Sequence, residues 1–134
     1  MRIEHLALYV SDLEGTKSFY QKYFGAAPNE LYHNPRTGLK TYFLSFESGS
    51  RLEIMQKPTV EVRSSAVEHT GYIHLAFVVG TEADVDSLTN ALRSEGYPVV
   101  SEPRTTGDGY YESVVLDPEG NRIELVQKSL IRSE

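Results

Sequence analysis

Two histidines and two glutamates recur at matching positions in the two halves of this chain. His5 and His74 each begin a His-Leu-Ala segment, and the two histidines are 69 residues apart. Glu53 and Glu124 each lie between aliphatic residues, two positions after an arginine, and they are 71 residues apart. Imidazole nitrogens and carboxylate oxygens are common ligands of divalent metal ions. Because a duplicated module can bring all four side chains to one point, a metal site is the first functional hypothesis.

The alternation of side chains along a strand supports this hypothesis. Successive side chains point to opposite faces of a sheet, so each glutamate lies on the face opposite its aliphatic neighbours. If those neighbours pack beneath a helix, Glu53 and Glu124 project from the other, concave face. A carboxylate on an enclosed face is costly unless it is paired or coordinates a metal. We therefore expect histidine and glutamate side chains from both halves to converge there.

The elements that would position these residues repeat as well. In the first half, the strand that starts at His5 is followed by Ser-Asp-Leu-Glu at 11–14, which matches a capping box, and Gly25 ends the helix. In the second half, a strand over 72–79 is followed by the box-like residues 81–84, and Gly96 ends the helix. Further strands are predicted over 41–47, 51–56, 111–116 and 121–127, the last two flanking an Asp-Pro-Glu-Gly turn.

The predicted fold class is therefore α+β, with two tandem βαβββ modules. Module one covers about residues 1–57 and module two about 72–128, within a single domain that spans 1–134. A polar segment over 57–71 links the two modules. The helical stripe of Val85, Leu88 and Leu92 is predicted to belong to the core.

The composition argues against several classes of protein. The chain has no cysteine, so disulfides, thiolate metal sites and a cysteine nucleophile are unavailable. A net charge of −6 argues against non-specific nucleic-acid binding, which needs a basic surface. No apolar run approaches membrane-spanning length, and the N-terminus lacks the pattern of a signal peptide. We expect a cytoplasmic protein that contacts neither nucleic acid nor membrane.

The two halves together resemble the vicinal oxygen chelate superfamily and, within it, the glyoxalase I branch. The resemblance rests on His-Leu-Ala-Leu-Tyr-Val-Ser-Asp-Leu at 5–13, Phe-Tyr at 19–20, Phe-Gly at 24–25, His-Leu-Ala-Phe at 74–77 and Leu-Asp-Pro-Glu-Gly-Asn-Arg-Ile-Glu-Leu at 116–125. It implies that the paired βαβββ modules form a curved mixed sheet around a metal site, often with a second chain completing the site. A homodimer is therefore expected.

Carried over by position, the resemblance implies that the metal ligands are His5, Glu53, His74 and Glu124. Two imidazoles and two carboxylates suit a divalent ion, nickel or zinc first, with cobalt and manganese as further options. The acidic Glu53 sets the chain apart from extradiol dioxygenases and fosfomycin-modifying thiol transferases, because the metal sites of those enzymes have three protein ligands. Epimerases of methylmalonyl-coenzyme A usually carry glutamine at that position.

The glyoxalase I branch isomerises the hemithioacetal of methylglyoxal, a 2-oxoaldehyde, and glutathione to a lactoyl thioester. The resemblance implies that a metal stabilises the enediolate as a Lewis acid. It also implies that a glutamate moves a proton between neighbouring carbons, as general base and then general acid. We assign this catalytic role to Glu124, and Glu53 could share it.

Two departures from the glutathione-dependent pattern keep other functions open. Tyr9 stands where those relatives often have an arginine, and Met-Gln-Lys at 55–57 replaces the usual asparagine region. One alternative keeps the metal and the enediolate chemistry but uses another thiol adduct or an acyl-coenzyme A. The other is a non-enzymatic small-molecule binding or resistance protein. Cations that could bind an anionic substrate are Arg36, Lys40, Lys57 and Arg104.

The remaining histidines and two tyrosines have simpler interpretations. His33 and His69 have no partner in the repeat and lie in loop-like sequence, so both are predicted to be solvated. The tyrosine-rich segments are mainly core and sheet surface. Tyr110 and Tyr111 follow Gly-Asp-Gly and could instead line the substrate pocket.

Overall fold

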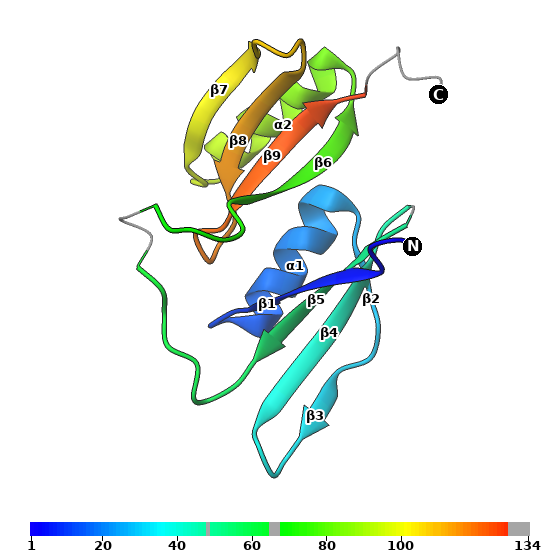
Figure 1. Cartoon of the computed structure of the whole chain (residues 1–134), viewed down its shortest axis with the longest axis vertical. Coiled ribbons are helices and arrows are strands. Elements are labelled where there is room, and N and C mark those ends of the chain that lie inside the picture. Colours follow the sequence, from blue (N-terminus) through cyan, green and yellow to red (C-terminus); the bar gives the residue numbers. More distant parts are fainter. Residues whose placement is uncertain (48, 65–67, 129–134) are drawn as a thin grey trace. The chain divides into compact units, whose positions relative to one another are not determined.

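The chain forms two compact units, Met1–Ala66 and Val67–Glu134, and each contains one helix and one sheet (Figure 1). The computed structural model describes residues 1–47, 49–64 and 68–128. The predicted α+β fold of two repeated modules is confirmed. Each module builds its own hydrogen-bonded sheet.

The first unit is a mixed sheet with a helix packed against it. Its elements are β1 (His5–Tyr9), α1 (Leu13–Phe24), β2 (Ala27–Pro28), β3 (Tyr32–Asn34), β4 (Leu39–Ser45) and β5 (Arg51–Gln56). The sheet order is β1-β5-β4-β2, with β1 parallel to β5, and β3 pairs with β4. The short β3 is an addition to the predicted pattern. It places His33 in a strand and not in a loop, although the side chain is exposed as expected.

The second unit has a similar arrangement, in which one strand is followed by a helix and then by three more strands. Its elements are β6 (His74–Gly80), α2 (Glu82–Ser94), β7 (Val99–Thr105), β8 (Tyr111–Leu116) and β9 (Arg122–Gln127). The sheet order is β6-β9-β8-β7, with β6 parallel to β9. The Asp-Pro-Glu-Gly turn joins β8 to β9, and the N–H of Gly120 donates to the carbonyl of Asp117 at 3.0 Å. The two sheet orders show that β1 and β6 are equivalent strands. Each comes first in the order of its sheet, and each begins with a histidine.

The helix ends follow local side-chain chemistry, with one correction. Asp12, and not Ser11 as the capping-box match predicted, caps α1 by accepting a hydrogen bond from the Gly15 N–H at 3.0 Å. The cap lies at Asp12 because Leu13 is buried in the core as the first residue of the helix, and the cap is the residue that precedes it. In α2 the predicted capping box is present in full. Gly25 ends α1 with a φ of 66°, which glycine adopts without a steric penalty.

The core of each unit lies between its helix and the face of the sheet beneath it. The fully buried large side chains are Tyr20, Leu44 and Ile54 in the first unit, and Val85, Leu92, Val115, Ile123 and Leu125 in the second. Leu88, the third residue of the predicted stripe, is half-buried. The buried strand residues alternate with residues that point to the opposite face, and that face carries the candidate site.

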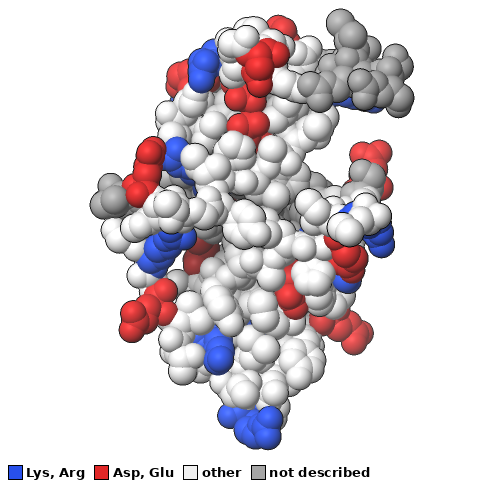
Figure 2. Space-filling model, in the orientation of Figure 1, with Lys and Arg blue, Asp and Glu red and all other residues white. Residues whose placement is uncertain are grey.

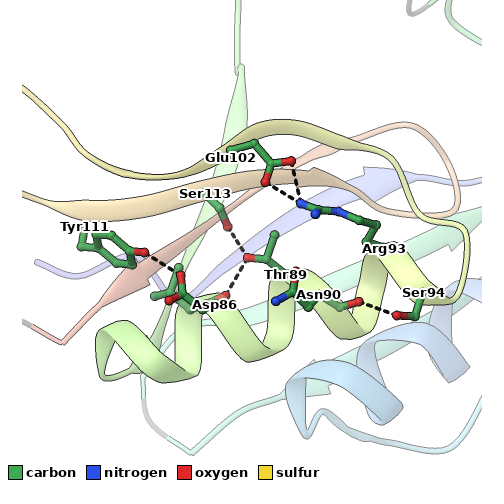
Figure 3. A network of polar contacts seen from close by, with 9 residues as sticks. Asp86, Thr89, Asn90, Arg93, Ser94, Glu102, Tyr111 and Ser113 are labelled. Carbon is green, nitrogen blue, oxygen red and sulfur yellow. Dashed lines mark hydrogen bonds and ion pairs between the residues drawn. The ribbon is translucent and has the colours of Figure 1, made fainter.

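Polar contacts hold α2 to β8 (Figure 3). The Tyr111 hydroxyl donates a 2.6 Å hydrogen bond to the Asp86 carboxylate, which raises the pKa of Tyr111 to about 12. The buried hydroxyls of Thr89 and Ser113 lie 2.7 Å apart. Because β8 pairs with β9, these contacts also fix the strand that carries Glu124.

The charged surface is mixed in sign. On the face that Figure 2 shows, Lys and Arg side chains are interspersed with Asp and Glu side chains. Neither α1 nor α2, the helices in the part of the chain that the structure describes, is long and apolar enough to span a membrane.

Candidate metal centre

His5 and Glu53 lie side by side on one face of the first sheet. In the parallel pairing of β1 with β5, Ala7 is opposite Glu53, so His5, two residues before Ala7, shares the face of that glutamate. The His5 Nε2 atom lies 3.9 Å from Glu53 Oε1. The flanking Leu52 and Ile54 are buried on the helix side. An imidazole nitrogen and a carboxylate oxygen are thus presented together away from the core.

His74 and Glu124 repeat this arrangement in the second unit. Ala76 is opposite Glu124 in the parallel pairing of β6 with β9, and His74 Nε2 lies 3.3 Å from Glu124 Oε2. Ile123 and Leu125, on either side of Glu124, are fully buried. The predicted projection of both glutamates from the face opposite their aliphatic neighbours is confirmed.

Each unit therefore supplies two potential metal ligands and not four. Within either unit, no group of three or more His, Asp or Glu side chains among the described residues could hold a metal ion. The donor atoms suit a divalent ion, because imidazole nitrogen and carboxylate oxygen are the ligands that nickel, cobalt, zinc and manganese bind. Their convergence into one four-ligand site stays a prediction.

The surroundings of His5 contain a charge cluster that the sequence analysis did not identify. The His5 Nδ1 atom lies 2.8 Å from a carboxylate oxygen of Glu4. Arg51 donates to the same carboxylate, and this contact is the first cause of a lowered Glu4 pKa. The Arg51 guanidinium lies 4.1 Å from the centre of the Phe43 ring, and the His5 ring meets Phe43 edge-on at 5.3 Å. The only sequence signal was the direct adjacency of Glu4 to His5.

The surroundings of Glu124 contain a second carboxyl group that sequence reasoning missed. Glu112 of β8 lies on the same face, since Glu124 pairs with Val114 two positions further along β8. Burial, reinforced by a hydrogen bond with Glu124, raises the pKa of Glu112 to about 7. Arg104, opposite Glu112 on β7, acts in the other direction. A proton can therefore reside next to Glu124 near neutral pH.

The other sequence candidates fall in different places. Tyr9 alternates with His5 and Ala7 on the same face and is 52% exposed, so it borders the His5–Glu53 pair. Tyr111 contacts α2 on the opposite side of its sheet and does not line the face that carries Glu124. Lys40 on β4 pairs across strands with His33 and is exposed.

The comparisons with known proteins agree with this fold. Residues 2–125 match the model of the Glyoxalase/Bleomycin resistance protein/Dioxygenase superfamily. A lactoylglutathione lyase of Haemophilus influenzae is 31% identical, over 99% of this chain and 97% of that protein. Among solved structures, a glyoxalase family protein from Enterococcus faecalis superposes with a TM-score of 0.77 at 27% identity, covering 93% of this chain and 96% of its own. The trypanothione-dependent glyoxalase I of Leishmania major superposes with a TM-score of 0.75 at 25% identity, covering 95% and 86%.

The extent of these matches decides the family. The family model spans nearly the whole chain, both units included, and the related proteins are matched over most of their length. The chain belongs to the Glyoxalase/Bleomycin resistance protein/Dioxygenase superfamily. Members of this superfamily bind small-molecule substrates, and many of them are enzymes that use a divalent metal ion.

Proposed function

We propose that this protein is a metal-dependent enzyme of the glyoxalase I type, which isomerises the hemithioacetal of a 2-oxoaldehyde and a thiol. Methylglyoxal detoxification is the corresponding cellular role. The proposed ligands are His5 and Glu53 from one unit and His74 and Glu124 from the other. Nickel and zinc are the first candidates for the ion.

The duplicated histidine–glutamate pair carries this proposal. In each unit an imidazole Nε2 and a glutamate oxygen approach to within 3.9 Å, on the sheet face opposite the core and beside an alanine. A single exposed histidine would have many explanations. Two equivalent pairs, in a chain 31% identical to a lactoylglutathione lyase, favour a shared metal.

In this proposal the metal, when bound, polarises the substrate oxygens and stabilises the negative charge that develops as the enediolate forms. Glu124 removes the proton from the hemithioacetal carbon and returns it to the neighbouring carbon, first as base and then as acid. The protonated Glu112 carboxyl can donate a hydrogen bond to Glu124 and keep that carboxylate oriented. Glu53 is a second carboxylate that could share the proton transfer.

Tyr9 favours a second candidate, the same isomerisation with a thiol other than glutathione. Tyr9 is 52% exposed beside the His5–Glu53 pair, where an arginine would offer a positive charge to a glutathione carboxylate. A solved structure similar to this chain, the glyoxalase I of Leishmania major, is described as trypanothione-dependent, and this similarity supports the second candidate. An acyl-coenzyme A substrate and a non-enzymatic binding protein stay as the further alternatives.

The deciding experiment measures turnover of the methylglyoxal–glutathione hemithioacetal by protein stripped of metal and reloaded separately with nickel and zinc. Turnover that appears only after reloading supports the proposal. Stoichiometric metal binding without turnover contradicts glutathione as the thiol and moves the assay to trypanothione and other thiol adducts. Absence of metal binding contradicts the metal site itself.

A homodimer and a cytoplasmic location belong to the same proposal. Light scattering of the metal-loaded protein distinguishes one chain from two. A mass equal to one chain at full metal occupancy would exclude a site shared between two copies.

A further inference from the structure

We propose that Glu4 is a positioning residue for His5. Its carboxylate keeps the imidazole proton on Nδ1 and so leaves Nε2 as the nitrogen that binds the metal. This inference rests on the proposed metal site and names a residue that would control one of its ligands. Glu4 itself touches neither metal nor substrate.

The hydrogen bond between these residues determines which nitrogen of the His5 imidazole carries the proton. The His5 Nδ1 atom lies 2.8 Å from Glu4 Oε2. An ionised carboxylate can only accept hydrogen bonds, so Nδ1 must be the donor and must carry the proton. In a neutral imidazole the other nitrogen then has a free lone pair. That nitrogen, Nε2, is the one that faces Glu53 at 3.9 Å.

Glu4 is held in place by contacts from a distant part of the chain. Its carbonyl accepts a hydrogen bond from the Arg51 N–H at 2.8 Å, where β1 and β5 begin to pair. The Arg51 side chain also donates to the Glu4 carboxylate and stacks over Phe43. The His5 ring lies nearly perpendicular to the same Phe43 ring, with the ring centres 5.3 Å apart. Glu4 and His5 are therefore oriented by one aromatic side chain and one arginine.

The second unit offers an internal comparison. Arg122 occupies the position equivalent to Arg51, opposite His74, and it also has an acidic partner, Glu68, at 3.6 Å. Among the described residues, however, Glu68 contacts the arginine and not the histidine. Glu68 thus matches Glu4 in charge and in pairing with an arginine, but lacks the imidazole contact.

Exposure sets the expected size of the effect. The Glu4 and His5 side chains are 43% and 41% exposed, so water competes for the hydrogen bond. We therefore expect Glu4 to affect the orientation of the His5 ring more than the stability of the fold. Loss of such an outer hydrogen-bond partner typically lowers metal affinity about 10- to 100-fold.

The first test needs no metal. Nitrogen-15 correlation spectra of the imidazoles of the metal-free full chain, recorded near pH 8.5 where histidine side chains are about neutral, report which nitrogen carries the proton. We expect the Nδ1–H form for His5 and its loss in Glu4→Ala. Glu4→Gln should retain it, because the amide oxygen still accepts a hydrogen bond. An Nε2–H form of His5 in the unchanged protein would overturn the inference.

The second test measures nickel and zinc affinity by competition with a chelator. Glu4→Ala should weaken binding by about tenfold or more. Glu4→Gln should weaken it less, and the matched control Glu68→Ala should leave it unchanged. Unaltered His74 signals serve as the check that each variant is folded. If the unchanged protein binds metal and Glu4→Ala binds it equally well, the inference is wrong. If the unchanged protein binds no metal, the proposed function and the ligand role fail together, while the spectra still decide whether Glu4 orients His5.

Discussion

The His74 imidazole on β6 and the Glu124 carboxylate on β9 approach to 3.3 Å across two parallel strands. Ala76 is opposite Glu124 in this pairing, so His74, two residues earlier on β6, lies on the same face of the sheet as the carboxylate. The first unit has the same relationship among His5, Ala7 and Glu53. This repeated register is the local reason why both units can pair an imidazole with a carboxylate.

Replacing Glu124 with glutamine tests its role in proton transfer. Glu124→Gln should lower kcat for the hemithioacetal by at least about 100-fold at saturating metal, because an amide cannot act as the base. The control is Glu95→Gln, which removes the same charge at the exposed end of α2. Near-normal kcat in Glu124→Gln would exclude Glu124 as the base and direct attention to Glu53.

Metal binding should depend on His74 but not on the other histidine of the second unit. His74→Gln should lower affinity for nickel and zinc by more than the roughly 10- to 100-fold typical of an outer partner, because a direct ligand is lost. His69→Gln is the matched control, since His69 is exposed and outside the sheet. Equal affinities for the two variants, measured by chelator competition, would remove His74 from the ligand set.

The buried hydroxyl pair beneath α2 should be strongly coupled. The Thr89 hydroxyl donates to the Val85 carbonyl at 2.6 Å, so the Ser113 hydroxyl must donate to Thr89. Thr89→Val leaves Ser113 buried without a partner and should lower the free energy of unfolding by about 1–3 kcal/mol. The double variant with Ser113→Ala should recover part of this loss. Urea denaturation curves give both values, and strictly additive effects would contradict the coupling.

Acid should weaken the contact between α1 and β4. The Tyr42 hydroxyl donates to Glu14 at 2.6 Å, and this hydrogen bond, followed by the contact with Lys17, lowers the Glu14 pKa below 4.5. A lowered folded-state pKa adds stability above the unfolded value, and that stability is lost as pH falls through the folded value. Because Glu14 is largely exposed, Tyr42→Phe should cost about 1 kcal/mol or less at neutral pH.

The measurement for this contact is the difference in unfolding free energy between the unchanged protein and Tyr42→Phe as a function of pH. The difference should be constant between about pH 5 and pH 9 and should shrink below this range, as Glu14 gains its proton in the folded state. It should also shrink above this range, because the raised pKa of Tyr42 makes ionisation of the phenol less favourable in the folded state. Tyr32→Phe, an exposed tyrosine of the same unit, is the control. A difference in unfolding free energy that grows toward acid pH would contradict the predicted direction of the pH dependence.

Much of the fold could be predicted because it depends on short-range rules. Strand alternation placed Leu52 and Ile54 in the core and Glu53 on the other face, and the register confirms that assignment. The capping box of α2 could likewise be predicted from four adjacent residues. The cap of α1 was wrong by one residue, because burial of Leu13 decided the phase of that helix.

By itself, the sequence determined the duplication, the four candidate ligands and the face on which each lies, because alternation along a strand needs no knowledge of distant neighbours. Only the tertiary structure decided which side chains surround them. Arg51 reaches Glu4 from 47 positions away, and Glu112 lies next to Glu124 through the register of β8 with β9. Such contacts depend on strand order and pairing register, which turns and core packing set together and which no local pattern encodes.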